Sequence, residues 1–292
     1  MLIRKVIAYF QRYFLYTEPL AIIKKDMKQL IQSISPKQVI EKFKQYWQDQ
    51  NKKRAISKYK GSAVKCPICN SSFRIFGKFG LNKRTNAKCH NCGSLERHRL
   101  LYLYISSIDT INIFDKNIKP IKLLHFAPEK IFYERFDVNQ SISYTPCDLF
   151  PELYNYSGKS KIEKVDITNI PFEDQSFDFI LCNHVLEHIP NDHLAMSELY
   201  RVLSKGGNGI FQVPIDYSRK ETYEDWSITS PKEREKAFGQ SDHVRWYGQD
   251  YKNRLEKVGF KVNEIDVTSL FSPDEVFTYG LTKSEKIYHC QK

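Results

Sequence analysis

Apolar and polar residues follow two different patterns along the 292-residue chain. From about residue 118 onward, short apolar runs alternate with amphipathic stretches, which is the pattern of strands and helices in turn. Strands are expected at residues 122–126, 143–146, 161–165, 177–182, 209–213 and 261–267, and helices after Pro128, at residues 192–203 and at residues 249–258. Such alternation predicts an α/β fold with a mostly parallel sheet covered on both faces. Residues 214–246 fit neither pattern and are expected to be irregular.

The N-terminal part of the chain has a helical pattern instead. Ser35, Pro36 and Gln38 form a helix start, with an N-cap, a proline at the first helical position and a capping box. We expect this helix to extend to about Gln50. The polar residues 49–60 that follow have the composition of a linker, so a module boundary is predicted there.

Positive charge is concentrated at the N-terminal end. Of the net charge of +11, residues 1–60 account for 14 Lys and Arg against 4 Asp and Glu, which suits a phospholipid surface, a nucleic acid or simply a solvated helical face. An apolar stripe in residues 1–16 suits a helix docked on the protein's own core, which we favour, or an interfacial helix. Arg4, Lys5 and Arg12 interrupt it, so neither a secretory signal nor a transmembrane segment is expected. The chain is predicted to be cytoplasmic, with peripheral membrane contact through residues 1–60 as an alternative.

The cysteines predict a metal site and reduced thiols. Two CxxC pairs, Cys66 with Cys69 and Cys89 with Cys92, have the spacing of a zinc ribbon, with a redox dithiol as the alternative. Four thiolates leave no open position, so the zinc should be structural, and His90 is a substitute ligand that we do not favour. The other three cysteines, Cys147, Cys182 and Cys290, occur singly. After the second pair, Ser94 is placed to cap a helix over residues 95–107.

Three stretches of the second half carry a resemblance to a known family. They are VDITNIPFEDQSFDFI at residues 165–180, NHVLEHI at residues 183–189 and ELYRVLSKGG at residues 198–207. In combination they resemble class I S-adenosylmethionine-dependent methyltransferases of the small-molecule type, over residues 121–267. The resemblance implies a Rossmann-like, doubly wound sheet that binds the cofactor at the carboxyl ends of its strands. The expected organisation is a basic helical segment (1–60), a zinc ribbon with its following helix (61–107) and an S-adenosylmethionine-binding domain (118–292).

The resemblance places cofactor contacts on two loops. Residues 125–129 stand where the family has a glycine-rich loop, but only Ala127 is small here. Glu129 is expected to meet the ammonium group of the cofactor. Asp148 follows the next strand, 19 residues later, and matches the acid that accepts both ribose hydroxyls.

The same resemblance implies further contacts at the ends of the third and fourth strands. Asp166 would accept the exocyclic amine of the adenine while the Ile167 side chain covers the ring. Asn183 would line the methionine end of the cofactor pocket. An aspartate at either strand end is also a common cap or turn residue, so the joint placement of Asp148 and Asp166 supports the assignment.

Three histidines are candidate general bases for removing a proton from the methyl acceptor: His184, His188 and His243. A structural hydrogen-bonding role is the alternative for each of them. Residues 184–188 also match the HxxEH pattern of zinc proteases. We reject that interpretation because Pro190 ends any helix and because the motif follows a strand. The resemblance predicts a short helical turn there instead.

Three functions compete. The favoured one is S-adenosylmethionine-dependent O- or N-methylation of a small-molecule or glycan acceptor, because the Asn/Asp-Pro-Pro-aromatic signature of base-methylating enzymes is absent. The second is an RNA methyltransferase that holds RNA through its basic N-terminus and ribbon. Its nucleic-acid surface would comprise Lys78, Lys83, Arg84 and Lys88 with Phe73, Phe76 and Phe79. The third is a non-catalytic scaffold, which the glycine-poor cofactor loop keeps open.

Overall fold

The computed structural model describes residues 36–80, 83–107 and 120–292, in two compact units, Met1–Lys58 and Tyr59–Lys292. In the first unit the described part is helix α3 (Pro36–Lys58). The predicted end at Gln50 and the predicted linker are therefore wrong. Residues 51–58 contain good helix formers, four of them basic, and neither glycine nor proline, so nothing in them stops the helix. The expected cap at Ser35 and the stripe of residues 1–16 lie outside the described residues.

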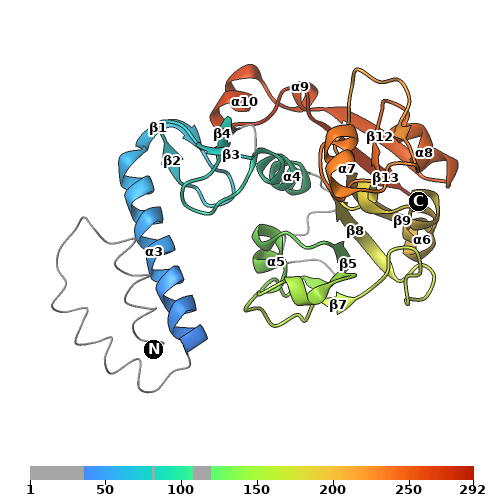
Figure 1. The fold of residues 1–292 in the computed structure, drawn as a ribbon, viewed down its shortest axis with the longest axis horizontal. Coiled ribbons are helices and arrows are strands. Elements are labelled where there is room, and N and C mark those ends of the chain that lie inside the picture. Colours follow the sequence, from blue (N-terminus) through green and yellow to red (C-terminus); the bar gives the residue numbers. More distant parts are fainter. Residues whose placement is uncertain (1–35, 81–82, 108–119) are drawn as a thin grey trace. The chain divides into compact units, whose positions relative to one another are not determined.

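The second unit is built on a seven-stranded sheet with the order β12-β13-β9-β8-β5-β6-β7 (Figure 1). Its strands are β5 (Ile121–Phe126), β6 (Ile142–Asp148), β7 (Glu163–Lys164), β8 (Phe177–Asn183), β9 (Leu203–Gln212), β12 (Lys261–Asp266) and β13 (Lys286–Gln291). Strands β5 to β9 pair in parallel, and β13 is antiparallel to both β9 and β12. The predicted α/β fold with a mostly parallel, Rossmann-like sheet is confirmed.

Strand β13 is the main element of the sheet that the sequence analysis missed. Residues 261–267 were expected to form the last strand, but the chain returns and inserts β13 between β12 and β9. Two short helices, α9 (Val267–Leu270) and α10 (Pro273–Tyr279), make the connection. Of the residues in β13, the central four are buried, which is why the strand reads as an apolar run without alternation.

Helices α5 (Lys130–Phe136), α6 (Asp192–Val202) and α8 (Tyr251–Lys257) lie where helices were expected. The stretch predicted to be irregular is not so throughout, since it contains α7 (Pro231–Phe238) and the paired strands β10 (Tyr223–Glu224) and β11 (Arg245–Trp246). Helix α7 has ordinary termini, with Ser230 as N-cap and Gly239 at φ 86° as C-cap. These two signals were present in the sequence and were overlooked.

The core of the second unit lies between the sheet and its helices. Fully buried apolar side chains come from β5, β8 and β9 and from the inner face of α6, including Leu124, Ile180, Phe211 and Leu199. The three single cysteines, Cys147, Cys182 and Cys290, are also fully buried in this core. They behave as small apolar residues, because burial raises the pKa of each thiol well above its ordinary value.

The segment of paired cysteines belongs to the same compact unit as the sheet. It contains two hairpins, β1 (Lys60–Lys65) with β2 (Ser72–Phe73) and β3 (Gly77–Phe79) with β4 (Arg84–Lys88), followed by α4 (Glu96–Ser107). We call residues 60–94 the ribbon. Its two hairpins and α4 lie next to one another in Figure 1.

One arginine of α4 joins the ribbon to the C-terminal part of the unit. The Arg99 side chain is fully buried, and its Nη1 donates to the carbonyl oxygens of Ala87 and Ser94, both at 2.9 Å. Its Nε and Nη2 donate to the carbonyl oxygens of Tyr279 (2.5 Å) and Gly280 (2.7 Å) at the end of α10. The guanidinium therefore fastens α10 onto the ribbon with four charge-assisted hydrogen bonds.

Candidate functional site

Four cysteine side chains converge in the ribbon. The Sγ atoms of Cys66 and Cys92 are 3.6 Å apart. Those of Cys69 and Cys89 are 3.7 Å apart, and all four sulfurs lie within 4.8 Å of one another. This spacing fits four thiolates around one tetrahedral zinc ion.

Two tight turns hold the cysteine pairs in place. Asn70 and Gly93 adopt the left-handed backbone conformation, with φ of 56° and 77°. The N–H of Asn70 donates to the carbonyl of Cys66, and that of Gly93 donates to the carbonyl of Cys89. Asn and Gly are the residues that tolerate this conformation best, so the local sequence suits the turns.

Two neighbouring side chains, Ser94 and His90, have roles that the structure defines; that of Ser94 differs from the expected helix cap. The Ser94 hydroxyl lies 3.3 Å from Cys66 Sγ and 3.2 Å from Cys92 Sγ, so it contacts the cysteine site and does not cap α4. His90 was considered as a substitute ligand. Its Nε2 instead hydrogen-bonds the carbonyl of Ile75 at 3.0 Å, and the four-sulfur group forms without it.

The ribbon does not present the aromatic surface that RNA binding was expected to use. Phe73 and Phe76 are 1% and 2% exposed and form the small ribbon core, whereas bases need accessible rings for stacking. Phe79 is exposed, with Lys88 Nζ 5.8 Å from its ring centre. Arg84 pairs with the Glu96 carboxylate at 3.2 Å. Of the three rings, only that of Phe79 is accessible, and Lys88 lies beside it.

The carboxyl ends of β5 and β8, which are neighbours in the sheet, both lead into a sharp turn. Ala127 and His184 begin these turns with φ of 46° and 57°. The left-handed conformation costs a residue with a side chain roughly 1–2 kcal/mol, so the surrounding structure must hold it. The N–H of Ala127 donates to the carbonyl of Cys147 (3.0 Å), and that of His184 donates to the carbonyl of Gln212 (2.7 Å).

Glu129 lies just beyond the first turn and carries a negative charge in a largely buried position. Burial by itself would raise the pKa of Glu129, but the hydrogen bond and charge of His125, with the charges of His98 and Arg97, lower it to about 2. His125 Nε2 donates to Glu129 Oε2 at 3.0 Å, and its Nδ1 hydrogen-bonds the Tyr144 hydroxyl at 3.0 Å. The other carboxylate oxygen, Oε1, is buried without a hydrogen-bond partner among the described residues. An ionised carboxylate with one free oxygen fits a bound ammonium group.

Helix α4 contributes two side chains to this edge that the sequence analysis missed. Burial is the main cause that lowers the pKa of His98 to about 4; the nearby charges of Arg97 and His184 act in the same direction, and that of Glu129 opposes it. Arg97 Nε and His98 Nε2 are both buried and have no hydrogen-bond partner in the part of the chain that the structure describes. The sequence signal for this contribution was the pair Arg97 and Arg99 on either side of His98, in an otherwise apolar helix.

Asp148 ends β6, as expected, and its carboxylate is already engaged. Its Oδ1 accepts from the N–H of Phe150 (2.8 Å) and its Oδ2 accepts from the Tyr154 hydroxyl (2.7 Å). The following residues expose apolar side chains: Leu149, Phe150 and Leu153 are 39%, 51% and 76% exposed. The end of β6 thus combines one carboxylate with accessible apolar surface.

Asp166 and Ile167 have different environments. The Asp166 carboxylate is exposed, and its Oδ1 accepts from the N–H (2.8 Å) and hydroxyl (2.7 Å) of Thr168, the arrangement of a local turn. Ile167 is 4% exposed and belongs to the hydrophobic core. Its side chain is therefore committed to core packing, in contrast to the expected contact with adenine.

Asn183, the last residue of β8, is 3% exposed, and neither atom of its amide has a hydrogen-bond partner within residues 36–80, 83–107 and 120–292. It belongs to a larger set of buried side chains with such atoms near this edge: Arg97, His98, Glu129, Asn183, Glu187 and His243. An unpaired buried polar group costs about 1–3 kcal/mol. A group of them at the carboxyl edge of a parallel sheet indicates a site that a polar ligand completes.

The three candidate bases lie beyond the end of β8. Glu187 and His188 belong to a 3-10 turn, η2 (Leu186–His188), which is the short helical turn predicted after this strand. His184 Nδ1 is 3.4 Å from Glu187 Oε1, and the rings of His188 and His243 meet edge to face at 4.8 Å. Burial is the main cause that lowers the pKa of His243, so this histidine is neutral at pH 7. The structure therefore brings His243 to the turn that contains His188.

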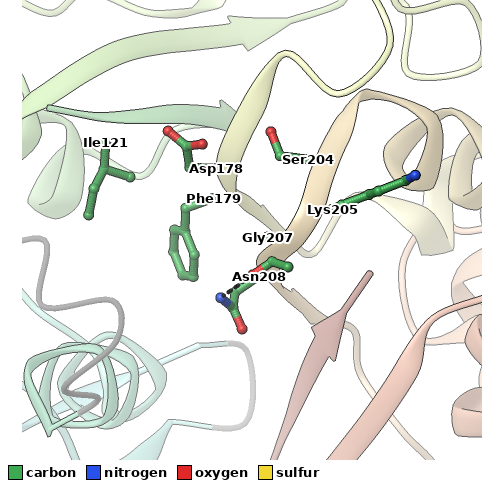
Figure 2. Close-up of a pocket in the computed structure, with 8 residues that line it drawn as sticks. Ile121, Asp178, Phe179, Ser204, Lys205, Gly207 and Asn208 are labelled. Carbon is green, nitrogen blue, oxygen red and sulfur yellow. Dashed lines mark hydrogen bonds between the residues drawn. The ribbon is translucent and has the colours of Figure 1, made fainter. Parts of the chain in front are cut away.

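A pocket also exists at the opposite, amino-terminal edge of the sheet (Figure 2). It has a volume of about 160 Å³ and is lined by the starts of β5 and β8 and the first half of β9. Its polar side chains are engaged within the protein. Asp178 accepts from the N–H of Lys122 (3.0 Å), and Asn208 accepts from His289 (2.8 Å) and Gln291 (3.1 Å). The unsatisfied groups at the carboxyl edge make that edge the better candidate site.

The fold is that of a Rossmann-like α/β protein, and the carboxyl ends of β5, β6 and β8 form its candidate ligand site. Comparison with known proteins agrees with this class: residues 132–211 match the family model described as a methyltransferase domain.

Curated relatives match part of the chain. Sterol 24-C-methyltransferase erg6 of Schizosaccharomyces pombe is 28% identical over 152 residues, which cover 49% of this chain and 38% of that protein. The ubiquinone/menaquinone biosynthesis C-methyltransferase UbiE of Brucella canis is 29% identical over 108 residues, covering 32% of this chain and 39% of that protein. The chain thus spans about two fifths of the length of these relatives.

Solved structures with a similar arrangement include an S-adenosylmethionine-dependent methyltransferase from Archaeoglobus fulgidus. It is 16% identical, with a TM-score of 0.44 over 68% of this chain and 95% of that one. The [4+2]-cyclase SpnF is 14% identical, with a TM-score of 0.45 over 75% of this chain and 87% of that one.

Proposed function

We propose that this protein transfers a methyl group from S-adenosylmethionine to a small-molecule or glycan acceptor. The observation that carries the proposal is the set of buried, unpaired polar atoms at the carboxyl ends of β5 and β8. The match of residues 132–211 to a methyltransferase domain supports the choice of cofactor.

The chain's own residues fit the polar groups of this cofactor. Glu129, ionised and with Oε1 unpaired among the described residues, would accept from the ammonium group. Arg97, whose Nε is buried next to it, would balance the cofactor carboxylate. Asp148 would take the ribose hydroxyls, after releasing or sharing its bond to Tyr154. The exposed Asp166 would accept from the adenine amine, and the buried Asn183 would line the methionine end.

The bound cofactor supplies an electrophilic methyl group, and the protein has to align the acceptor and, for a hydroxyl or protonated amine, remove a proton. Neutral His243 and the half-exposed His184 and His188 are the proposed bases. The exposed apolar residues after β6 would accommodate an apolar acceptor or the adenine ring. Since the curated relatives are named for sterol and quinone C-methylation, apolar acceptors belong in the screen together with glycans.

We also propose that Cys66, Cys69, Cys89 and Cys92 hold a structural zinc ion. The four sulfurs lie close enough together for one ion, and all four positions of a tetrahedron are filled. The zinc would stabilise residues 61–107 as a unit that supports α4. In this arrangement the ribbon would hold α4 in place, and α4 would position Arg97 and His98 at the cofactor site.

Calorimetry of S-adenosylmethionine and S-adenosylhomocysteine binding tests the proposal. We expect a dissociation constant in the micromolar range, which corresponds to a binding free energy of about −8 kcal/mol. Glu129→Gln should weaken binding at least tenfold, because a hydrogen bond to a charged group contributes about 1.5–3 kcal/mol. Asp148→Ala should weaken it to a similar or greater extent.

The matched control is Asp178→Asn, which makes a comparable change at the amino-terminal edge of β8, in the pocket of Figure 2. It should leave the affinity unchanged. If the folded, zinc-loaded protein binds neither compound, the enzymatic proposal fails and the scaffold interpretation takes its place.

A further inference from the structure

Three side chains near the end of β8 form a second group with the composition of a metal site. Glu187, His188 and His243 each offer one ligand atom, and the three atoms lie within 4.8 Å of one another. Glu187 and His243 are 1% and 3% exposed, while the His188 side chain is 31% exposed. The group is therefore closed on its protein side and reachable through His188.

Each of the three residues is oriented by a neighbour that leaves one ligand atom available. His243 Nδ1 hydrogen-bonds the carbonyl of Phe238 at 3.0 Å, so this nitrogen carries the proton and Nε2 has the free lone pair. His188 Nδ1 faces Asp242, 3.3 Å from its carbonyl oxygen and 3.4 Å from its carboxylate. Metal-binding histidines characteristically donate their second N–H to such a carbonyl or carboxylate.

Two atoms of this group are buried and have no hydrogen-bond partner among the described residues. Glu187 Oε1 lies 3.4 Å from His184 Nδ1, but Glu187 Oε2 has no hydrogen-bond partner in the described part of the chain. The same holds for His243 Nε2, and both atoms are buried. With the His243 proton on Nδ1, neither atom has a hydrogen to donate, so a cation or a hydrogen-bond donor would satisfy both.

The backbone that carries the three residues is held firmly. The N–H of Val244 donates to the carbonyl of Glu187 at 3.0 Å, which ties the segment of His243 directly to η2. Next to it, Arg245 is 1% exposed, and its guanidinium donates to the carbonyl oxygens of three residues at the same turn: Leu186 (2.9 Å), Ile189 (2.5 Å) and Pro190 (2.9 Å). A ligand set supported in this way is preorganised.

We propose that Glu187, His188 and His243 form a site for a divalent transition metal, separate from the four-cysteine site. Two imidazoles and one carboxylate suit Zn²⁺, Co²⁺, Fe²⁺ or Mn²⁺ and leave positions for water or substrate. The ion would draw the three ligand atoms closer, mainly through rotation of the accessible His188. In this site the distant His243 replaces His184, the first histidine of the HxxEH pattern.

The role of the metal in catalysis rests on the proposed methyl transfer. Since η2 directly follows Asn183 and His184, the ion would lie beside the methionine end of the cofactor site. A metal there would bind an oxygen of the acceptor and stabilise its deprotonated form, while His184, the one proposed base that is not a ligand, would take the proton. The acceptor class would accordingly be one with a hydroxyl, phenol or enol oxygen at or next to the methylated atom.

Cobalt titration tests the site. Protein loaded with one zinc per chain at the cysteine site is titrated with Co²⁺, and bound metal is followed by visible absorption and by elemental analysis. We expect one Co²⁺ per chain beside the zinc, with a d–d spectrum and without the thiolate-to-cobalt charge-transfer band that exchange into the cysteine site produces. Glu187→Gln and His243→Asn should each weaken Co²⁺ binding at least tenfold, and Glu187→Gln keeps the size of the side chain.

The matched control is His193→Asn on the exposed side of α6, which should bind Co²⁺ as the wild type does. The proposal is overturned if the zinc-loaded wild type binds no thiolate-free Co²⁺. It is also overturned if both site variants bind Co²⁺ as tightly as the wild type. Cofactor calorimetry on the same samples separates the two claims. Cofactor binding without a second metal removes this site alone, and a second metal without cofactor binding removes the methyltransferase proposal alone.

Discussion

Single residues at the carboxyl edge of the sheet show how the fold tolerates groups that it does not satisfy. Glu129 stays ionised in a largely buried position because His125 donates to one of its oxygens. Asn183 is held at the end of β8 without a hydrogen bond to its amide among the residues described. Such residues weaken the empty protein and favour the bound one, which is the expected arrangement at a ligand site.

His98 provides a test at this scale through the pH dependence of stability. Its pKa is lowered from 6.5 to about 4, chiefly by burial, so below pH 6.5 the unfolded chain takes up a proton that the folded chain does not. The stabilising contribution is therefore complete above pH 6.5 and is lost as the pH falls through about 4. At pH 5 the loss is about 2 kcal/mol.

The measurement is urea unfolding of the zinc-loaded protein at pH 7 and pH 5. Between pH 7 and pH 5, the free energy of unfolding of His98→Gln should fall by about 2 kcal/mol less than that of the wild type. For His193→Gln, on the exposed side of α6, it should fall by as much as for the wild type. An unchanged pH slope in His98→Gln would show that the histidine is protonated in the folded state.

At the scale of elements, α4 is the connection on which the second unit depends. One turn of this helix directs Arg97 and His98 toward the carboxyl edge of the sheet, while Arg99 binds the ribbon and the end of α10. Gly280 is required at that junction, because a Cβ atom there would lie 2.7 Å from Phe76 and 2.9 Å from the Arg99 guanidinium. The three consecutive residues therefore couple the ribbon to the site.

Replacing Arg99 by Met should destabilise the protein by at least about 3 kcal/mol, since four buried carbonyl oxygens lose a charged donor. Urea unfolding at pH 7 measures the loss, and amide hydrogen exchange should show α10 opening first. Arg84→Met is the control, because Arg84 makes an exposed ion pair with Glu96 that contributes less than about 1 kcal/mol. Equal effects of the two substitutions would contradict the proposed clamp.

At the scale of the whole second unit, the ribbon and the sheet belong to one compact unit, so we expect a metal bound at the cysteines to affect the proposed cofactor site outside the ribbon. The chain contains too few residues between Lys60 and Ser94 for a large core of their own. The buried apolar residues described there are Val64, Cys66, Ile68, Phe73, Phe76, Ala87 and Cys89. The unit is thus expected to need its metal for the position of α4. No helix among the described residues has the length and hydrophobicity to cross a membrane.

Removing the metal with a chelator should lower the affinity for S-adenosylmethionine at least tenfold, because α4 loses its support, and adding Zn²⁺ back should restore it. Calorimetry before and after chelation measures the change. The same experiment on Glu187→Gln excludes a contribution from the second group of ligands. A metal-free protein with undiminished affinity would show that the ribbon is independent of the cofactor site.

Local sequence determined a large part of this structure. The succession of strands β5 to β9 along the chain, Asp148 at the end of β6 and the cysteine pairs all follow from periodicity and short spacing, because a strand or a tight turn is specified by residues close together in the chain. The helix end at Gln50 and the missed α7 are errors of the same local kind, in which start and stop signals were read incorrectly. The helix proposed for residues 1–16 and the three-part domain division remain predictions.

Contacts between distant residues were decided by the tertiary structure alone. Strand β13 enters the sheet between two earlier strands, α4 brings Arg97 and His98 to the end of β5, and His243 reaches η2. An apolar pattern indicates which face of a helix or strand is buried, but it does not indicate which residues of other elements pack against that face. Ile167 illustrates the limit: its position shortly after strand β7 follows from the local sequence, whereas its burial in the hydrophobic core depends on the elements packed around it.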